Sequence, residues 1–451
     1  MKMKKLSTII LSVAMLSTLL SGCGSKTAEN TPSPTDTPSK TEVAAPSEQK
    51  ASSEPVTISF YGGWTGPDLD RMTSLVNKFN ESHPDIKVEF TSLQWSQIFA
   101  KFLADYQSGS SPEILAMHTF EMGQFVDMGV LDADAIEGIG LNKDDYLSTP
   151  WEGTILNGRQ YAVPLDINMH ALFYNTELFE KAGITSPPTN KEEFIAAAQK
   201  LTLDSTGKNP TDPGFNKDDI VQYGLGFNMN HHVFYQAYGL MNQQGYNPFT
   251  EDMTSISFDQ DKAGAAFQFL EDLIFKYQVV PVGEKSPIDD FKAGTVAMII
   301  DGNWQLAGLE TADVKWATAV YPQIFEEKAV WGASDILTIP LSKNPDAAKT
   351  AAAGAFVKWM AENAEEWAES GQLPANKAAF ETSKTMPGRQ AFIDEIEYTK
   401  FLSPHPLATQ IFSSSAPSPI LTAAQSAVLN NNDVKDIIPQ FEKDINAVLG
   451  Q

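Results

Sequence analysis

Aromatic and polar side chains stand at the ends of several predicted strands. Trp64 follows the strand at 56–61 and two glycines, while His118 and Phe120 stand at the end of the strand at 113–118. Ligands of open α/β sheets bind beyond the carboxyl ends of the strands, and glycine lets the backbone approach a ligand closely. We therefore expect Trp64, His118 and Phe120 to line a binding site. Core packing of Trp64 and a structural role for His118 are the alternatives.

Three further residues have a similar placement. Asn228 follows a strand at 223–227, Trp95 follows a strand at 86–90, and Asp301 opens a strand-to-helix turn. Asp301 could accept hydrogen bonds from a ligand or cap the helix, and Trp95 could equally pack in the core. Four other tryptophans are expected to be structural, two of them on an amphipathic helix: Trp151, Trp316, Trp359 and Trp367.

Motifs of metal and nucleophile chemistry are missing from the sequence. It contains no Gly-x-Ser-x-Gly elbow, no His-Glu-x-x-His and no Walker loop, and the adjacent His231 and His232 lack the spacing of zinc ligands. The polar insert at 204–219 carries several Asp residues. Their spacing differs from an EF-hand, so a solvated loop is favoured over a calcium site. We expect neither a metal nor a cofactor.

Composition narrows the class of protein. The 451 residues include 32 Lys and Arg against 57 Asp and Glu, which gives a formal net charge of −25. This balance argues against a nucleic-acid partner, because such proteins neutralise phosphates with clustered basic residues. Hydrophobic residues make up 42% of the chain, which suits a globular protein with a large core, and the length suggests two or three units.

The start of the chain predicts a secretory address. A basic start, Lys2 to Lys5, precedes a mostly apolar run at 6–20, which is too short for a comfortable membrane span but fits a signal peptide. The sequence Leu20-Ser21-Gly22-Cys23 resembles the lipobox of bacterial lipoproteins. That resemblance implies cleavage before Cys23 and a lipid on this residue. A plain signal peptide with an incidental cysteine is the alternative.

The residues after the lipobox predict a tether. Cys23 is the only cysteine, so a disulfide within the chain is impossible. Residues 24–55 are rich in Pro, Ser and Thr and poor in large apolar residues, as expected of a spacer. We therefore expect a signal peptide at 1–22 and a lipidated tether at 23–55. The folded body would be held at the outer face of the cytoplasmic membrane.

From Val56 onward, predicted strands and helices alternate. Strands at 56–61, 86–90 and 113–118 are separated by two helical patterns, and the first pattern, at 68–80, places its apolar residues on one face. A strand that is followed by a helix and a second strand forms a crossover unit. The pattern therefore predicts an α/β fold, with mostly parallel sheets flanked by helices.

Several segments carry a recurrent order of motifs. The segment at 158–202 has a Tyr-x-x-Pro strand, a Tyr-Asn pair, a Phe-x-x-Ala-Gly helix and Pro-Pro, here Tyr161, Pro164, Tyr174-Asn175, Phe179, Ala182-Gly183 and Pro187-Pro188. The segments at 291–304, 331–343 and 371–375 follow in the same order. Together they resemble the extracellular solute-binding proteins of ABC-type sugar importers, the maltose-binding-protein-like family. Asn190-Lys191 replaces a usual tryptophan, and Trp331-Gly332 stands where a Gly-Gly pair is common.

The resemblance implies a two-lobed, periplasmic-binding-protein-like fold that closes on a ligand. The chain would cross between lobes near Asp166, near 331–334 and near Gly371. One lobe would hold 56–166 and about 334–370, and the other about 167–333 and 371–451. A monomer would capture a sugar, and an oligosaccharide is favoured over a monosaccharide. It would deliver this sugar to the membrane subunits of an ABC importer.

The resemblance also implies further binding residues. Trp304 would be the platform under a sugar ring, and Trp331 with Gly332 would wall the cleft at the second crossing. Asp166 and Asn168, at the first crossing, would reach the ligand or make hinge hydrogen bonds.

Two other functions stay open. An exported glycosidase would need a positioned carboxylate pair, which 57 acidic residues cannot exclude. The same scaffold could also carry a polyamine or glycerol phosphate. The only charged candidates besides His118 are Asp166 and Asp301, which favours a neutral ligand.

Overall fold

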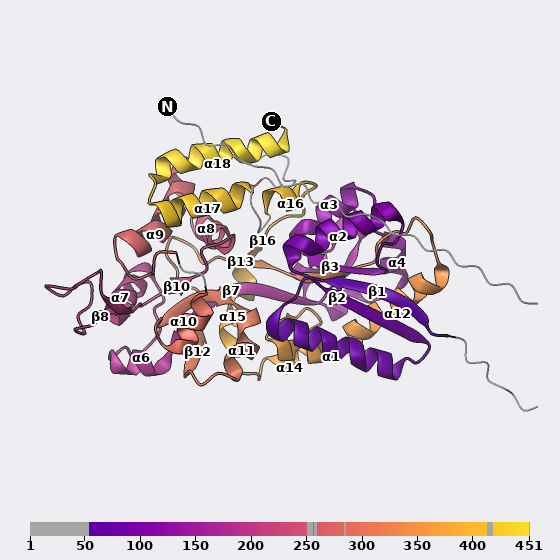
Figure 1. Ribbon diagram of the computed structural model, residues 1–451, viewed down its shortest axis with the longest axis horizontal. Helices are drawn as coiled ribbons and strands as arrows, with labels where there is room; N and C mark the ends of the chain where they lie inside the picture. Colours follow the sequence, from indigo (N-terminus) through magenta and orange to yellow (C-terminus); the bar gives the residue numbers. More distant parts are fainter. Residues whose placement is uncertain (1–53, 250–255, 257–258, 284–285, 413–417, 451) are drawn as a thin grey trace, which may run out of the picture. The chain divides into compact units, whose positions relative to one another are not determined.

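The computed structural model describes residues 54–249, 256, 259–283, 286–412 and 418–450 (Figure 1). The predicted signal peptide at 1–22, Cys23 and nearly all of the tether at 23–55 therefore lie outside the described residues. Across the described ranges, no helix has both the length and the apolar character that a membrane span needs.

Five strands form the first sheet, in the order β2-β1-β3-β14-β6. Strand β1 pairs in parallel with β2 and β3, whereas β14 pairs antiparallel with β3 and β6. The bounds are β1 Val56–Gly62, β2 Ile86–Ser92, β3 Ile114–His118, β6 Ala162–Pro164 and β14 Asp335–Thr338. Three long helices pack on this sheet, α1 Gly66–Ser82, α2 Trp95–Ser108 and α12 Ala347–Glu362.

The predicted helix at 68–80 is confirmed as the body of α1. Its predicted apolar face is buried through Met72, Leu75, Val76 and Phe79. These residues share a core with Phe60 of β1 and Phe356 of α12, as expected for a helix that covers one face of a sheet.

The second sheet is built around β7, Asp166–Asn175, which pairs antiparallel with four other strands. Its order is β10-β11-β7-β13-β16, with β12 and β15 also paired to β7. The bounds are β10 Gly226–Phe227, β11 Met298–Gly302, β12 Trp316–Ala319, β13 Val330–Ala333, β15 Leu373–Pro374 and β16 Thr399–Phe401. Its longer helices are α7 Lys191–Leu201, α8 His232–Asn242, α9 Gln260–Phe275, α17 Pro419–Asn430 and α18 Val434–Leu449 (Figure 1).

The prediction of mostly parallel sheets is wrong, because both sheets are mixed. Strands β1 and β3 end toward the second sheet, whereas β14 enters the first sheet from β13 of the second. A strand that arrives from the opposite side must run against its neighbours. The crossover units that predict parallel pairing account for β1, β2 and β3, and the returning strand accounts for the antiparallel pairs.

The chain passes between the two sheets at three places. Leu165 joins β6 to β7, Ser334 joins β13 to β14, and Gly371-Gln372 leads from η4, Ala368–Ser370, to β15. At the third place Gly371 has φ of +113°, a conformation that favours glycine. The predicted limits of the two lobes in sequence stay a prediction.

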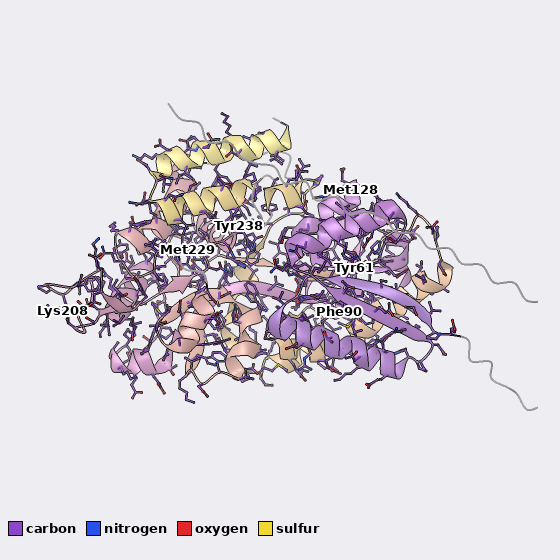
Figure 2. All side chains as sticks on the ribbon, in the orientation of Figure 1. Tyr61, Phe90, Met128, Lys208, Met229 and Tyr238 are labelled. Carbon is purple, nitrogen blue, oxygen red and sulfur yellow. The ribbon has the colours of Figure 1, made fainter. Side chains whose placement is uncertain are left out.

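The polar insert between β8, Leu203–Asp204, and β9, Ile220–Gln222, closes on Asp204. One carboxylate oxygen accepts from the backbone of Thr206 and Lys208, and the other accepts from Asn216 N at 2.9 Å. Hydrogen bonds from Thr206 and from these backbone groups lower the pKa of Asp204 to about 2. Figure 2 shows Lys208 at the outer end of this loop. Both oxygens of the Asp204 carboxylate thus accept hydrogen bonds from their own loop, which favours the solvated loop over a calcium site.

Candidate binding cleft

A cleft of about 880 Å³ lies between the two sheets, at the carboxyl ends of β1 and β3. Residues from both sides line it, as expected for a ligand site of an open α/β sheet. Seven of the eleven residues predicted for the site are brought together here: Trp64, Trp95, His118, Phe120, Asn168, Trp304 and Trp331.

Two predicted residues at the crossings have structural contacts instead. Asp166 is fully buried, and its carboxylate accepts hydrogen bonds from Asp335 N at 2.8 Å and from Trp367 Nε1 at 2.7 Å. These bonds join the first crossing to the second and correspond to the hinge alternative. Gly332 pairs with Met169, and a Cβ there would lie 2.9 Å from Asn168 O. It therefore permits close packing and does not line the cleft.

Two more predicted residues lie just behind the lining. The Asp301 carboxylate accepts from Gly302 N at 2.8 Å and from Gln305 Nε2 at 3.1 Å, so it is held within its own turn, but it does not cap the helix, whose N-cap residue is Gly302. Burial raises the pKa of Asp301 to about 6. Asn228 accepts from the backbone of Asn230 at 3.2 Å, and Asn230 rather than Asn228 reaches the cleft.

The tryptophans on the first side form a linked group. Trp64 is only 2% exposed, and its ring packs edge-on against Trp95 at 5.4 Å and Trp367 at 5.5 Å. Its Nε1 donates to Asp335 Oδ2 at 2.7 Å. Trp95 is more open and lies 4.4 Å from the ring of His118. Trp64 thus supports the cleft wall, while Trp95 offers more ring surface to a ligand.

Three acidic residues line the cleft, and the sequence had suggested none of them. They are Asp68 in the first turn of α1, Glu121 in η1, Thr119–Glu121, and Asp335 at the start of β14. Burial, reinforced by the charge of Asp335, raises the pKa of Asp68 well above its usual range. Burial also raises the pKa of Asp335, although His118 opposes this. No Lys or Arg is among the described lining residues.

His118 lies between two of these acids. Its Nδ1 is 3.0 Å from Glu121 Oε2, and its Nε2 is 3.6 Å from Asp335 Oδ1. Burial alone would lower the pKa of His118, but the charges and hydrogen bond of Glu121 and the charge of Asp335 outweigh it, so the pKa is raised. The ring stacks on Phe120 at 5.2 Å and 2°. His118 is therefore a hydrogen-bonding centre of the first wall.

The opposite wall is aromatic and uncharged. Tyr235 stacks on Trp331 at 4.2 Å and 7°, and Trp304 lies 5.5 Å from the ring of His232. Burial lowers the pKa of His170 to about 3 and that of His231 to about 4, so both are neutral at physiological pH. Trp331 Nε1 and His231 Nδ1 are both buried without a hydrogen-bond partner, which leaves two unmatched polar atoms among the lining residues of this wall.

The arrangement can hold a ligand with apolar faces and many hydroxyls. Indole and phenol rings from both sides can cover flat apolar faces, and carboxyl and amide groups can hydrogen-bond hydroxyl pairs. Sequence reasoning missed Asp68, Glu121 and Tyr235 because each lies within a helix, where the pattern indicates only a face. Within the described ranges, no group of three or more His, Cys, Asp and Glu is arranged to hold a metal ion.

Relatives of known name are similar to this chain over part or most of its length. A Brucella abortus protein named as a binding protein is 28% identical over 148 residues, which is 32% of this chain. The chain spans only about a third of that relative's length, 35%. A maltooligosaccharide ABC transporter solute-binding lipoprotein of Streptococcus pneumoniae is 23% identical over 394 residues, which cover 84% of this chain and 82% of the relative.

A solved structure matches the fold of this chain, and a family model matches its sequence. The maltose/maltodextrin-binding domain MalE of Bdellovibrio bacteriovorus, bound to maltotriose, superposes with a TM-score of 0.74 at 20% identity. The match covers 88% of this chain and all of that domain, and it shows the two-lobed fold. Residues 74–390, well over half of the chain, match the model of the bacterial extracellular solute-binding protein family. The chain therefore belongs to the bacterial extracellular solute-binding proteins.

Proposed function

We propose that this protein captures an uncharged oligosaccharide in the cleft and delivers it to the membrane subunits of an ABC importer. One observation carries the proposal. Aromatic rings from both sides face a cleft whose described lining holds hydrogen-bonding groups but no Lys or Arg. Rings such as Trp95 and Trp304 suit the apolar faces of sugar rings, and the acids, amides and His118 suit hydroxyls.

The size of the cleft favours several sugar rings over one. Small-molecule sites span about 300–1,000 Å³, and the cleft, at about 880 Å³, is near the upper end. The names of the relatives point the same way, since the pneumococcal relative is named for maltooligosaccharides and the Bdellovibrio domain holds maltotriose. Maltotriose is therefore the first ligand to test.

Charge argues against the two other solutes. A phosphate ester buried against Asp68, Glu121 and Asp335 would have no Lys or Arg beside it among the described lining residues. Of the lining histidines, His231 and His232 have lowered pKa values and are neutral, and an unpaired buried charge is costly. A polyamine would need ionised acids. Glu121 and Asp335 already face His118, and burial raises the pKa of Asp68 well above its usual range, which favours its uncharged form.

The remaining sequence predictions complete the proposal. Cys23 would carry a lipid that holds the monomeric protein at the outer face of the cytoplasmic membrane. The lobes would comprise 56–166 with about 334–370, and about 167–333 with 371–451. Trp64, Trp95, His118, Phe120, Asn168, Trp304 and Trp331 would line the bound sugar, and lobe closure would retain it. The protein would release the sugar chemically unchanged.

Ligand-dependent unfolding of residues 23–451, with Cys23→Ser, tests the proposal. The ligands are maltotriose, other neutral oligosaccharides, spermidine and glycerol 3-phosphate. A ligand present at about 100 times its Kd should stabilise the fold by about 2.7 kcal/mol. Stabilisation by a neutral oligosaccharide that mass spectrometry recovers intact is the expected result. Stabilisation by only spermidine or glycerol 3-phosphate, or hydrolysis of the sugar, would overturn it.

A further inference from the structure

A chain of hydrogen bonds crosses from one wall of the cleft to the other through the third crossing. Asn303 Nδ2 donates to Gln372 Oε1 at 2.8 Å, and Gln372 Nε2 donates to Asp68 Oδ2 at 3.0 Å. Asn303 directly precedes the ring of Trp304, whereas Asp68 lies in the first turn of α1, four residues after Trp64. These hydrogen bonds therefore connect the segment that carries Trp304 to the segment that carries Trp64.

The orientation of each amide in this chain is fixed. Asn303 Oδ1 accepts from Met169 N at 3.0 Å, and its Nδ2 also donates to Ile167 O at 3.1 Å, both on β7. The carbonyl of Gln372 must therefore face Asn303, and its NH₂ group must face Asp68. The backbone of the crossing is held close as well, because a Cβ on Gly371 would lie 2.5 Å from Asn303 O.

The Asp68 carboxyl has one oxygen committed and one unmatched. Its Oδ2 accepts from Gln372, whereas its Oδ1 is buried without a hydrogen-bond partner, because the neighbouring Ser370 hydroxyl donates its hydrogen bond to Trp367 O at 2.7 Å. Asp68 is 8% exposed and lines the cleft, as does Gln372. An unmatched buried polar atom is costly, so a ligand hydroxyl, which can donate or accept, would relieve this cost by a hydrogen bond with Oδ1.

We propose that Gln372 is a positioning residue. It is held by Asn303 of one wall and fixes the orientation of the Asp68 carboxyl on the other wall, where this carboxyl binds the ligand. The third crossing connects the two lobes and also carries Gln372. A change in the geometry of this crossing should therefore change how Asp68 contacts the ligand, which couples the two. Only the choice of sugar as the ligand rests on the proposed function. The coupling itself rests on the hydrogen bonds.

Gln372→Met tests the proposal, with Gln243→Met as the matched control. Methionine is similar in size but removes both hydrogen bonds. Gln243 is also buried, and its amide bonds Pro322 O, Ala329 O and Ile324 N, all outside the cleft lining. Both variants should unfold at a lower temperature. Only Gln372→Met should weaken maltotriose binding, by tenfold or more, and equal affinities for the two variants would overturn the proposal.

A double-mutant cycle separates positioning from direct ligand contact. If Gln372 acts through Asp68, Gln372→Met should weaken maltotriose binding tenfold or more in the wild-type background and less than twofold in an Asp68→Ala background, which has no carboxyl to position. Equal losses in both backgrounds would mean that Gln372 does not act through Asp68. Should Gln372→Met fail to fold, Gln372→Asn keeps an amide but shortens its reach, and the same cycle applies.

A second readout needs no ligand. Dyes on Lys87→Cys in β2 and Lys181→Cys in α6, Thr176–Lys181, with Cys23→Ser, report the distance between the lobes by energy transfer. The ligand-free distance distribution should broaden in Gln372→Met but not in Gln243→Met. Failure of the wild type to bind any sugar would overturn the proposed function and leave this measurement decisive. Identical distributions in the two variants would then overturn the coupling.

Discussion

The ring of Trp304 lies directly over Gly302. A Cβ on Gly302 would come within 2.0 Å of Trp304 Cζ3. The opposite wall repeats the relationship, because a Cβ on Gly63 would come within 1.9 Å of Trp95 Cδ2. Each wall therefore places an indole over a glycine, and in both the missing side chain makes room for a ring. At Gly63 the glycine therefore admits the ring of Trp95, where a ligand was expected to approach the backbone.

Gly302→Ala should weaken ligand binding without touching the ligand. The new methyl group overlaps the ring, so Trp304 must leave its place over the backbone. We expect a loss of maltotriose affinity of about tenfold, or about 1.4 kcal/mol, by calorimetry. Gly138→Ala is the control, since a Cβ there meets nothing within 4 Å. An affinity for Gly302→Ala equal to that of the control would contradict the dependence on this glycine.

Trp304→Ala should cost more affinity than any change behind the lining. Truncation of a central aromatic contact typically costs about 2–4 kcal/mol, which is roughly 30- to 1,000-fold in Kd. Trp359→Ala is the comparison, because Trp359 packs on Phe79 away from the cleft. It should lower the free energy of unfolding while the Kd stays within about twofold. A similar Kd for both variants would remove Trp304 from the site.

Asp301→Asn should stabilise the protein increasingly as the pH rises. Burial raises the pKa of Asp301 from 3.8 to about 6, so its contribution to stability is fully present below 3.8 and is lost as the pH rises through about 6. Asparagine avoids this loss. The stability of the variant relative to the wild type should increase by about 1.4 kcal/mol between pH 5 and 7.5.

Urea unfolding at several pH values checks this expectation. Asp85→Asn, at an exposed position, is the control against which the pH dependence of Asp301→Asn is measured. If the difference between Asp301→Asn and the wild type does not change with pH, the carboxyl of Asp301 is not held in its protonated form by burial.

The sequence predicted individual elements better than their assembly. The apolar face of α1 and the strands at 56–61, 86–90 and 113–118 are all confirmed, because their periodicity reflects local burial. The direction in which β14 and β7 pair with their neighbours could not be predicted from periodicity. Pairing direction depends on which side of the molecule a strand arrives from, and local periodicity carries no such information.

In the cleft, residues at strand ends could be predicted from the sequence, whereas residues within helical turns could not. Trp95, His118 and Trp304 stand at strand ends, where sequence patterns indicate a site, and all three line the cleft. Asp68 and Gln372 are 304 residues apart and meet only because the third crossing returns to α1. A polar residue in a helical turn gives no sign of such a contact. The ends of predicted strands thus indicate residues of each wall separately. Contacts between the walls depend on the tertiary structure and could not be predicted from the sequence.

His118→Gln should destabilise the protein more at pH 6 than at pH 8. The charges that face His118 are Glu121 and Asp335, and these carboxylates raise its pKa in the folded state, whereas the neighbouring His231 and His232 are neutral. A raised histidine pKa contributes stability that is fully present below the unfolded value of 6.5 and is lost as the pH rises through the folded value. Removing His118 removes this contribution, so the difference between variant and wild type should grow as the pH falls.

Urea unfolding at pH 6, 7 and 8 measures this difference. His83→Gln is the control, because His83 stacks on Phe79 far from these acids in sequence and has no carboxylate partner among the described ion pairs. The pH dependence of His118→Gln is measured against this control. An effect of His118→Gln that is constant from pH 6 to 8, or larger at pH 8, would mean that Glu121 and Asp335 do not hold a proton on His118. The first wall of the cleft would then carry the negative charge of Glu121 and Asp335 without a positive charge on His118.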